Sequence, residues 1–214
     1  MRKPRVELYK EADKRVLELK KYTAAEFNGL TRLAHFDEVN VIRINRAVNG
    51  VYRRVNRRAK RCFDDIAWAA IEEDIYELEE EKPKKPDAEE IVDEQLRAYN
   101  PITKYVYNNE IIRKAARCRE AIVATSGNQA LRPVIARELK YLLLQEQQYG
   151  DCVTDAARTE TFAENGVKRV MWITQRDDRV CEECLALNGL IFPIDQIPPK
   201  PHYACRCYVE PVED

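Results

Sequence analysis

The stretch VNVIRINRAVNGVYRRVNRRAKRCFDDIAWAAIEEDIYELEE, residues 39–80, decides the fold. Its apolar residues recur every three or four positions, which places them on one stripe of an α-helix. The stripe continues well beyond the length of an ordinary helix, although the pair Asn49-Gly50 is where such a helix would bend or break. The stretch therefore predicts a long helix that buries Val48, Tyr52, Val55, Ala59, Cys62, Ile66 and Ala70.

Helices are also predicted on both sides of this stretch, because the chain has only six glycines in 214 residues. The first covers residues 6–22, and Thr23-Ala24-Ala25-Glu26 has the pattern of a capping box that opens a further short helix. Asp87 is positioned to cap a helix through residue 98. Near the end of this region, Gly150 is expected to separate a helix over residues 129–149 from another over 151–164.

After residue 166 the sequence changes from helix-forming to β-prone. Three short β-prone runs follow, at residues 170–174, 190–192 and 203–209, separated by prolines. A module of this size is too small to bury an adequate core without help. The prediction is a mainly α (α+β) protein with two parts: an elongated helical body over residues 1–166, with a Pro/Lys hinge at 82–87, and a small zinc-stapled β module over 167–214.

A cluster of metal-ligating residues lies in this last segment. Cys181-x-x-Cys184 is followed by seventeen residues and then by His202-x-x-Cys205-x-Cys207. A Cys-x-x-Cys knuckle supplies two thiolates to a tetrahedral zinc ion, and a second short-spaced pair completes the shell. Four of the five residues are therefore expected to bind zinc, and the spacing leaves open whether Cys205 or Cys207 is the fourth ligand.

Two alternatives to a structural zinc site fit the sequence less well. Paired disulfides would suit an exported protein with an even number of cysteines, whereas this chain has seven and begins with no apolar export segment. A catalytic zinc usually has three protein ligands and an open position, and the open-site motif His-Glu-x-x-His does not occur. A Cys-rich shell indicates a closed site that stabilises the fold.

The same region resembles a known family in the order and spacing of its motifs, which are Ala157-Arg158-Thr159-Glu160, Asn165-Gly166, Trp172, Asp178-x-Val180-Cys181-x-x-Cys184, Asn188-Gly189, Pro198-Pro199 and His202-x-x-Cys205-Arg206-Cys207. Over residues 157–211 this order is similar to the C-terminal signature of the Mu F-like phage head morphogenesis family. The resemblance implies a minor head protein of a tailed bacteriophage, located in the virion at the portal vertex or capsid interior, and needed for head assembly or DNA delivery. It implies no catalysis.

The charged and aromatic residues of the signature are expected to support the zinc module. Acid–base catalysis would need a pocket and a tuned pKa, which the sequence does not indicate. An Arg–carboxylate network that ties the last helix to the zinc module accounts for the same charged residues, since bidentate pairs fix geometry. Trp172 is expected to fill the hydrophobic centre of the module. The predicted supporting residues are Arg158, Glu160, Trp172, Asp178 and Arg179.

Charge is segregated along the helical body. Residues 43–61 carry eight basic side chains and no acidic one, whereas residues 72–94 carry twelve acidic side chains against three lysines. Clustered arginines can neutralise DNA phosphates or contact an acidic protein surface. Only one aromatic residue lies within the basic run, which disfavours stacking on single strands. The candidate contact residues are Arg53, Arg54, Arg57, Arg58 and Arg61.

The sequence thus favours a non-enzymatic minor head protein, with portal or capsid proteins as partners and packaged DNA as a further candidate. No stretch approaches the roughly 20 apolar residues of a membrane helix. The alternative is a zinc-containing nucleic-acid-binding protein, and a metal-dependent hydrolase or nuclease is a weaker third interpretation.

Overall fold

The structure is a computed structural model that describes residues 6–31, 33, 41–78, 82–125, 128–174, 180–203 and 205–212. It confirms the predicted class, since 72% of the chain is helical. The helices are α1 (Val6–Leu30), α2 (Val41–Leu78), α3 (Ala88–Arg97), α4 (Tyr107–Val123), α5 (Asn128–Glu164) and α6 (Glu182–Leu187). The strands are β1 (Tyr99–Asn100), β2 (Tyr105–Val106), β3 (Arg169–Ile173), β4 (Ile191–Pro193) and β5 (Tyr208–Pro211), with a short 3₁₀ turn, η2 (Ile194–Gln196).

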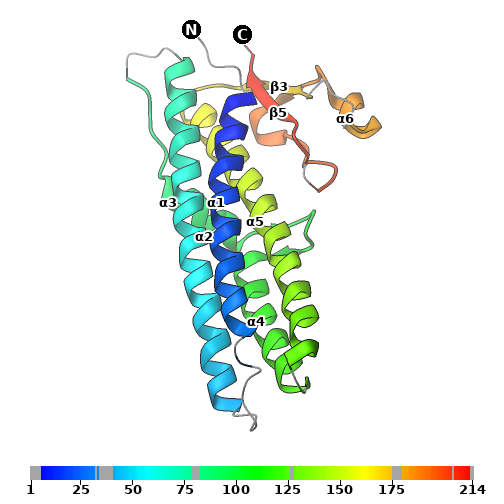
Figure 1. The fold of residues 1–214 in the computed structure, drawn as a ribbon. Helices are drawn as coiled ribbons and strands as arrows, with labels where there is room; N and C mark the ends of the chain where they lie inside the picture. Colours follow the sequence, from blue (N-terminus) through cyan, green and yellow to red (C-terminus); the bar gives the residue numbers. More distant parts are fainter. Residues whose placement is uncertain are drawn as a thin grey trace.

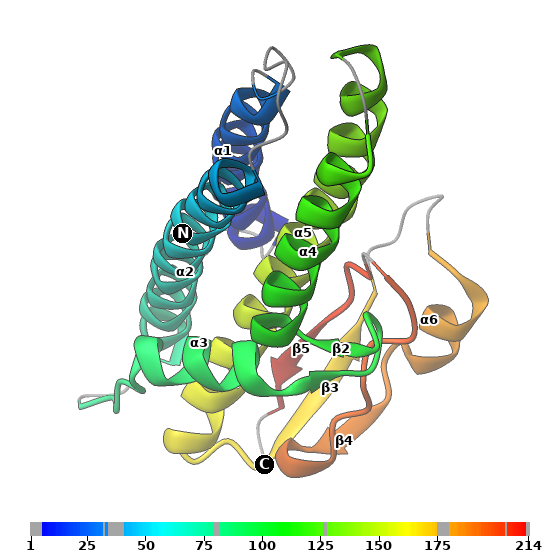
Figure 2. The same ribbon diagram turned by 90° about the horizontal axis from the view of Figure 1, so that it is seen from below.

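Four long helices lie side by side in an elongated bundle (Figure 1). Helices α1, α2 and α5 pack against one another, α4 packs on α2 and α5, and the short α3 covers α2 and α5 near one end (Figure 2). The prediction for the long central helix is confirmed, because every residue of its expected stripe is at most 7% exposed. Among the described residues, no helix is both long enough and apolar enough to cross a membrane.

The break expected at Thr23 is wrong, because α1 continues unbroken from Val6 to Leu30. Thr23 does not act as a cap. Its side chain is fully buried, and its hydroxyl donates a hydrogen bond of 2.6 Å to Oε1 of Glu146 on α5. The polar pattern that looked like a helix start is instead a contact between two helices, which local spacing does not distinguish from a cap.

The break expected at Gly150 is also wrong, and Asn49-Gly50 does not interrupt α2 either. Helix α5 passes through Gly150 because this residue lies against α1. A Cβ atom placed there would come within 2.7 Å of Cγ2 of Val16. The glycine therefore permits two helices to approach closely, and this use outweighs its weak intrinsic preference for the helix.

The segment over residues 82–87, predicted as a hinge, has no regular secondary structure. Asp87 caps α3 as predicted, accepting hydrogen bonds from the backbone amides of Glu89 and Glu90. Asn165, at the end of α5, holds Lys84 by two hydrogen bonds, one from the Lys84 amide at 2.7 Å and one to the Lys84 carbonyl at 2.9 Å. The segment is thus tied to the C-terminal end of α5.

The C-terminal segment forms an antiparallel sheet in the order β4-β3-β5, at one end of the bundle (Figure 1). Trp172 of β3 pairs with Val209 of β5, and Val170 pairs with Phe192 of β4. The last strand was expected to begin at residue 203, but it begins at Tyr208. The residues before it form the loop that carries the Cys/His residues.

Candidate metal centre

The first half of the candidate metal centre is a knuckle at the start of α6. Cys181 is the N-cap residue, and its Sγ accepts a hydrogen bond of 3.3 Å from the backbone amide of Cys184. Cys184 lies one turn into the helix and is 2% exposed. Both sulfur atoms therefore lie at the same end of a short helix, with the amide aimed at one of them.

The second half comes from the loop before β5. Nε2 of His202 lies 3.3 Å from Sγ of Cys184, and Sγ of Cys205 lies 3.5 Å from the same sulfur. Nδ1 of His202 is 2.9 Å from the carbonyl oxygen of Tyr203. When the Nδ1–H group donates a hydrogen bond to this carbonyl, the imidazole is neutral and Nε2 carries the free lone pair that a metal ligand requires. A backbone partner of this kind is typical of metal-ligating histidines.

Two overlapping groups have ligand atoms within 4.8 Å of one another, namely Cys181, Cys184 and His202, and Cys184, Cys205 and Cys207. Around a tetrahedral zinc ion bound to sulfur, neighbouring ligand atoms would be about 3.8 Å apart. The distances at Cys184 are close to that spacing. The donor set is soft, consisting of four thiols and one imidazole, which suits a thiophilic metal. The described residues thus form a centre that can bind a metal, with Cys184 common to both groups.

The protonation of the cluster also favours a metal. A hydrogen bond from the Cys184 amide lowers the pKa of Cys181, and a hydrogen bond with the Cys207 thiol lowers the pKa of Cys205 to about 5. Burial raises the pKa of Cys184 to about 12. Because the thiolate is the form that binds metal, Cys181 and one thiol of the hydrogen-bonded Cys205–Cys207 pair ionise most readily as ligands. A dication would compensate for the cost of ionising the third.

The loop that carries the second half is anchored to the bundle. Lys200 forms an ion pair of 2.5 Å with Asp155 of α5, and the hydroxyl of Tyr9 donates to the other oxygen of the same carboxylate at 2.5 Å. The hydroxyl of Tyr203 donates to the carbonyl of Leu144. The loop that carries the candidate metal ligands is thus positioned by contacts with α1 and α5 as well as by its own module. Sequence reasoning missed Lys200 and Asp155, since no motif relates them.

The residues predicted to support the site occupy different places. Arg158 is 1% exposed, and its Nε and Nη2 atoms donate to both carboxylate oxygens of Asp74 at 2.8 to 3.1 Å. The pair therefore joins α5 to α2. The sequence had predicted that this arginine would join α5 to the module. Glu160 is exposed, whereas Trp172 is 2% exposed in the core of the sheet. Asp178 and Arg179 lie outside the described residues.

The candidate contact residues lie together on α2. All five arginines are exposed. Arg54 pairs with Glu26 of α1 at 2.7 Å, so it is partly neutralised. A groove of about 650 Å³ runs between α1 and α2, and its basic lining residues are Lys21, Arg54, Arg57, Arg58 and Arg61.

The fold and site together define a helical-bundle protein with a C-terminal Cys/His-rich sheet module. Residues 108–210 match the family model described as Phage Mu protein F like protein, which confirms the resemblance inferred from the motifs. The match begins in α4, well before the residues on which the resemblance rested, so it includes both helices that lead into the module. No curated protein and no solved structure matches the chain.

The C-terminal part of the chain is therefore similar to Phage Mu F-like proteins, as the order of its motifs indicated. The matched region contains nearly all of α4, all of α5, β3 and β4, and β5 as far as residue 210, so it includes parts of both the bundle and the module.

Proposed function

We propose that this protein is a non-enzymatic minor head protein of a tailed bacteriophage or prophage, bound at the portal or inner capsid and stabilised by one structural zinc ion. The observation that carries the proposal is the family match over residues 108–210, which ends on the strand beside the Cys/His cluster. The cluster supports zinc because four of its five donors are thiols, and because the imidazole has a backbone partner on its other nitrogen.

The ligand set proposed is Cys181, Cys184 and His202, completed by either Cys205 or Cys207. Metal analysis of protein purified without chelator should find about one zinc per chain, because the five donors fill only one tetrahedral shell. Replacing Cys205 and Cys207 separately with Ser identifies the fourth ligand as the one whose loss removes the metal. Protein without zinc or another thiophilic metal would contradict the proposal.

We further propose that the helical body makes the main contact with portal or capsid proteins, through the exposed arginines of α2. Its long surface and segregated charge support this, because the small module is less than a quarter of the chain and three of the seven buried residues in its core are candidate metal ligands. Reversing the charges of Arg53, Arg57 and Arg58 should weaken co-purification with the head proteins, more strongly at low salt. The matched control reverses Arg132 and Lys140, which are exposed on α5.

Nucleic-acid binding is a second candidate function, favoured by the groove between α1 and α2. Lys21, Arg57, Arg58 and Arg61 line it and could neutralise phosphates along a DNA backbone. DNA affinity should then fall steeply as salt rises, and it should fall further in the variant with reversed charges. Equal affinity of wild type and variant for DNA would remove this candidate and leave the protein contact.

A further inference from the structure

Helix α2 keeps one long face open to solvent. The helix lies along one side of the bundle (Figure 1), and its exposed residues recur every three or four positions over about 33 Å at 1.5 Å per residue. We call this face the outer stripe. Its members are Arg54, Arg57, Arg58, Arg61, Asp65, Trp68, Glu72 and Tyr76.

The outer stripe changes sign once along its length. Its charged members up to residue 61 are all arginines, and from residue 65 onward they are the carboxylates Asp65 and Glu72. Within the part of the chain that the structure describes, Arg54 is the one charged member with an ion-pair partner, which is Glu26 of α1. The remaining charges of both signs are therefore available to a partner outside the chain.

Two aromatic side chains lie in the acidic half of the outer stripe. Trp68 is 43% exposed and Tyr76 is 72% exposed, and neither forms a hydrogen bond or a ring contact with the other described residues. Trp, Tyr and Arg are the side chains that contribute most of the binding energy at protein interfaces. The composition of the stripe is thus that of a contact surface, because a helix face that is only solvated does not need exposed aromatic rings.

The order of residues along the outer stripe is complementary to its own reverse. If two α2 helices run antiparallel about a two-fold axis at residue 63, residues at equal distances on either side of that point face each other. Arg61 then faces Asp65 of the second copy, and Arg58 faces Trp68, where a guanidinium can lie over the indole ring. Each contact occurs twice, because the same surface is used by both copies.

Other arrangements fit the outer stripe less well. A parallel pair of α2 helices would place arginines opposite arginines and carboxylates opposite carboxylates, which is repulsive. A DNA backbone would match the arginines but would be repelled by Asp65 and Glu72. A second, antiparallel copy of the same helix matches both halves of the stripe at once.

We propose that the outer stripe is a self-association surface that joins two copies of this chain into an antiparallel two-fold dimer through α2. Its central contacts are Arg61 with Asp65 and Arg58 with Trp68. The dimer does not rest on the proposed function. Arg53 lies roughly 80° around α2 from Arg61, so the dimer leaves this arginine exposed to a head protein.

The experiment measures the dimer dissociation constant of the full chain with its metal by sedimentation at several protein and salt concentrations. Wild type should form dimers that weaken as salt rises. Arg61→Asp and Asp65→Arg should each weaken self-association roughly tenfold or more, because the central pair becomes a pair of like charges on both sides of the axis. Arg132→Asp and Glu120→Arg, at exposed positions on α5 and α4, are the matched controls and should dimerise like wild type.

Mixing the two variants separates a lost interface from a lost fold. Arg61→Asp has acidic side chains at both central positions, and Asp65→Arg has basic ones at both. Neither variant is complementary to itself, but each is complementary to the other. An equimolar mixture should therefore form heterodimers about as tightly as wild type forms homodimers, and native mass spectrometry distinguishes the species by mass.

The two tryptophans give an independent measurement. Trp68 lies in the proposed interface, whereas Trp172 is buried in the module. In ¹⁵N spectra the indole signal of Trp68 should shift as the concentration of wild type rises, while that of Trp172 should not. Arg61→Asp should abolish this concentration dependence.

The inference is overturned if wild type stays monomeric at low salt, if both single variants dimerise as tightly as wild type, or if their mixture forms no heterodimer. Co-purification with head proteins is measured on the same variants. If wild type is a monomer and Arg61→Asp loses the head proteins, the dimer fails and the proposed function stands. If the dimer forms and no head protein co-purifies, the proposed function fails and the dimer stands.

Discussion

The bundle and the module are stabilised in different ways. In the described residues, the bundle buries one continuous apolar cluster of thirty-two residues, contributed by all five of its helices. The cluster of the module has seven buried members, and three of them are the cysteines 184, 205 and 207. One region has a large hydrophobic core, whereas the other has a small core in which candidate metal ligands lie beside Phe162, Val170, Trp172 and Val209. Changes that prevent metal binding should therefore destabilise the module, whereas changes that disturb packing should destabilise the bundle.

The largest expected effect is the loss of the module when its shared ligand is removed. Cys184→Ser should reduce the metal content to none and expose the backbone amides of β3, β4 and β5 to hydrogen exchange. Structural zinc contributes about 10–16 kcal/mol in small zinc domains, so the module should not remain folded. Helix content, followed by circular dichroism, should be largely retained. Cys62→Ala, in the bundle core, is the control and should keep its metal.

The comparison would collapse if Cys184→Ser unfolded both regions together. That outcome would mean that the bundle depends on the module, and the contacts of Lys200 and Tyr203 with α5 would be the reason.

The next largest effect concerns the buried ion pair within the bundle. Arg158→Met should remove the bidentate ion pair from the buried Asp74 carboxylate and lower the free energy of unfolding by about 3–5 kcal/mol. The double variant Arg158→Met/Asp74→Asn removes that charge and should recover part of the loss. Chemical denaturation followed by helix content measures both. Equal stability of the single and double variants would show that the charge is not the cause.

A smaller effect depends on pH. Burial raises the pKa of Glu146 to about 7, above its usual value near 4.5. The folded protein therefore holds this proton more tightly, so the free energy of unfolding should fall as pH rises from about 4.5 to about 7 and then level off. Glu146→Gln keeps an acceptor for Thr23 and should be more stable than wild type by roughly 3 kcal/mol at pH 8, and by little at pH 4.

Asp151, whose pKa is raised to about 7 by burial, adds a slope of the same sign. The difference between Glu146→Gln and wild type is therefore the quantity to measure, with Glu120→Gln on the exposed face of α4 as control. A difference that does not change with pH would contradict the prediction.

The smallest effect tests the close approach of α1 and α5. Gly150→Ala should destabilise the bundle by about 1–3 kcal/mol, because its Cβ would lie 2.7 Å from Cγ2 of Val16. Gly29→Ala, also in a helix, meets nothing within 4 Å and should stabilise by about 0.5–1 kcal/mol. If the melting temperature falls for Gly150→Ala and rises for Gly29→Ala, then packing, not helix propensity, explains the glycine at position 150.

The fold was predictable where local chemistry agrees with packing. The apolar spacing of α2 and the cap at Asp87 are of this kind. The predictions at Thr23 and Gly150 were wrong because their local signals match a helix start and a helix end, while their partners, Glu146 and Val16, lie far away in sequence. A single sequence gives no information on such distant partners, so packing can reverse a local preference.

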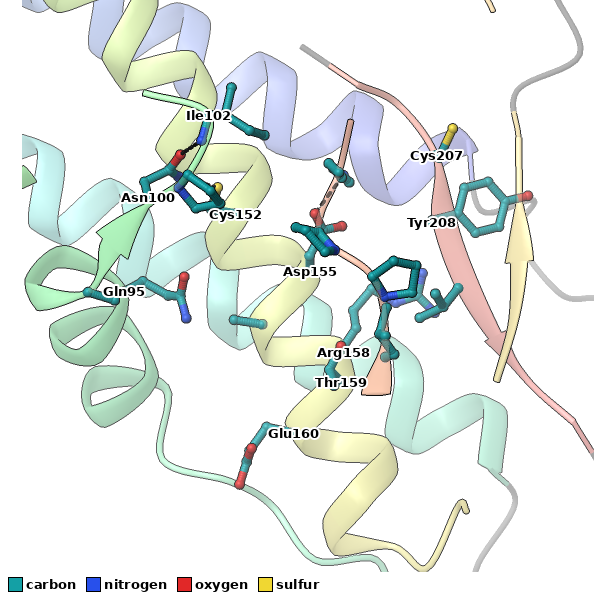
Figure 3. Close-up of a pocket in the computed structure, with 18 of the residues that line it drawn as sticks. Gln95, Asn100, Ile102, Cys152, Asp155, Arg158, Thr159, Glu160, Cys207 and Tyr208 are labelled. Carbon is teal, nitrogen blue, oxygen red and sulfur yellow. Dashed lines mark hydrogen bonds and ion pairs between the residues drawn. The ribbon is translucent and has the colours of Figure 1, made fainter. Parts of the chain in front are cut away.

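In the candidate site, too, the features that depend on local sequence were predictable, whereas those that depend on contacts distant in sequence were not. Short spacing was sufficient to identify the five candidate metal donors, which the structure places in two overlapping groups, and the family resemblance was visible in the same motifs. The partner of Arg158 was not predictable, because Asp74 is 84 residues away on another helix. A cavity of about 490 Å³ between the bundle and the module was not predictable either, since its walls come from α3, α5, the loop before β5 and β5 itself (Figure 3), which only the folded chain brings together.

The continuity of α2 has a geometric consequence. Its 38 residues span about 57 Å at 1.5 Å per residue. The module lies at one end of this span, and the C-terminal end of α1 and the N-terminal end of α2 lie at the other (Figure 1). That separation is several times the screening length of about 8 Å at physiological salt. A charge bound at one end is therefore not felt at the other, so the two ends of the bundle are electrostatically independent surfaces.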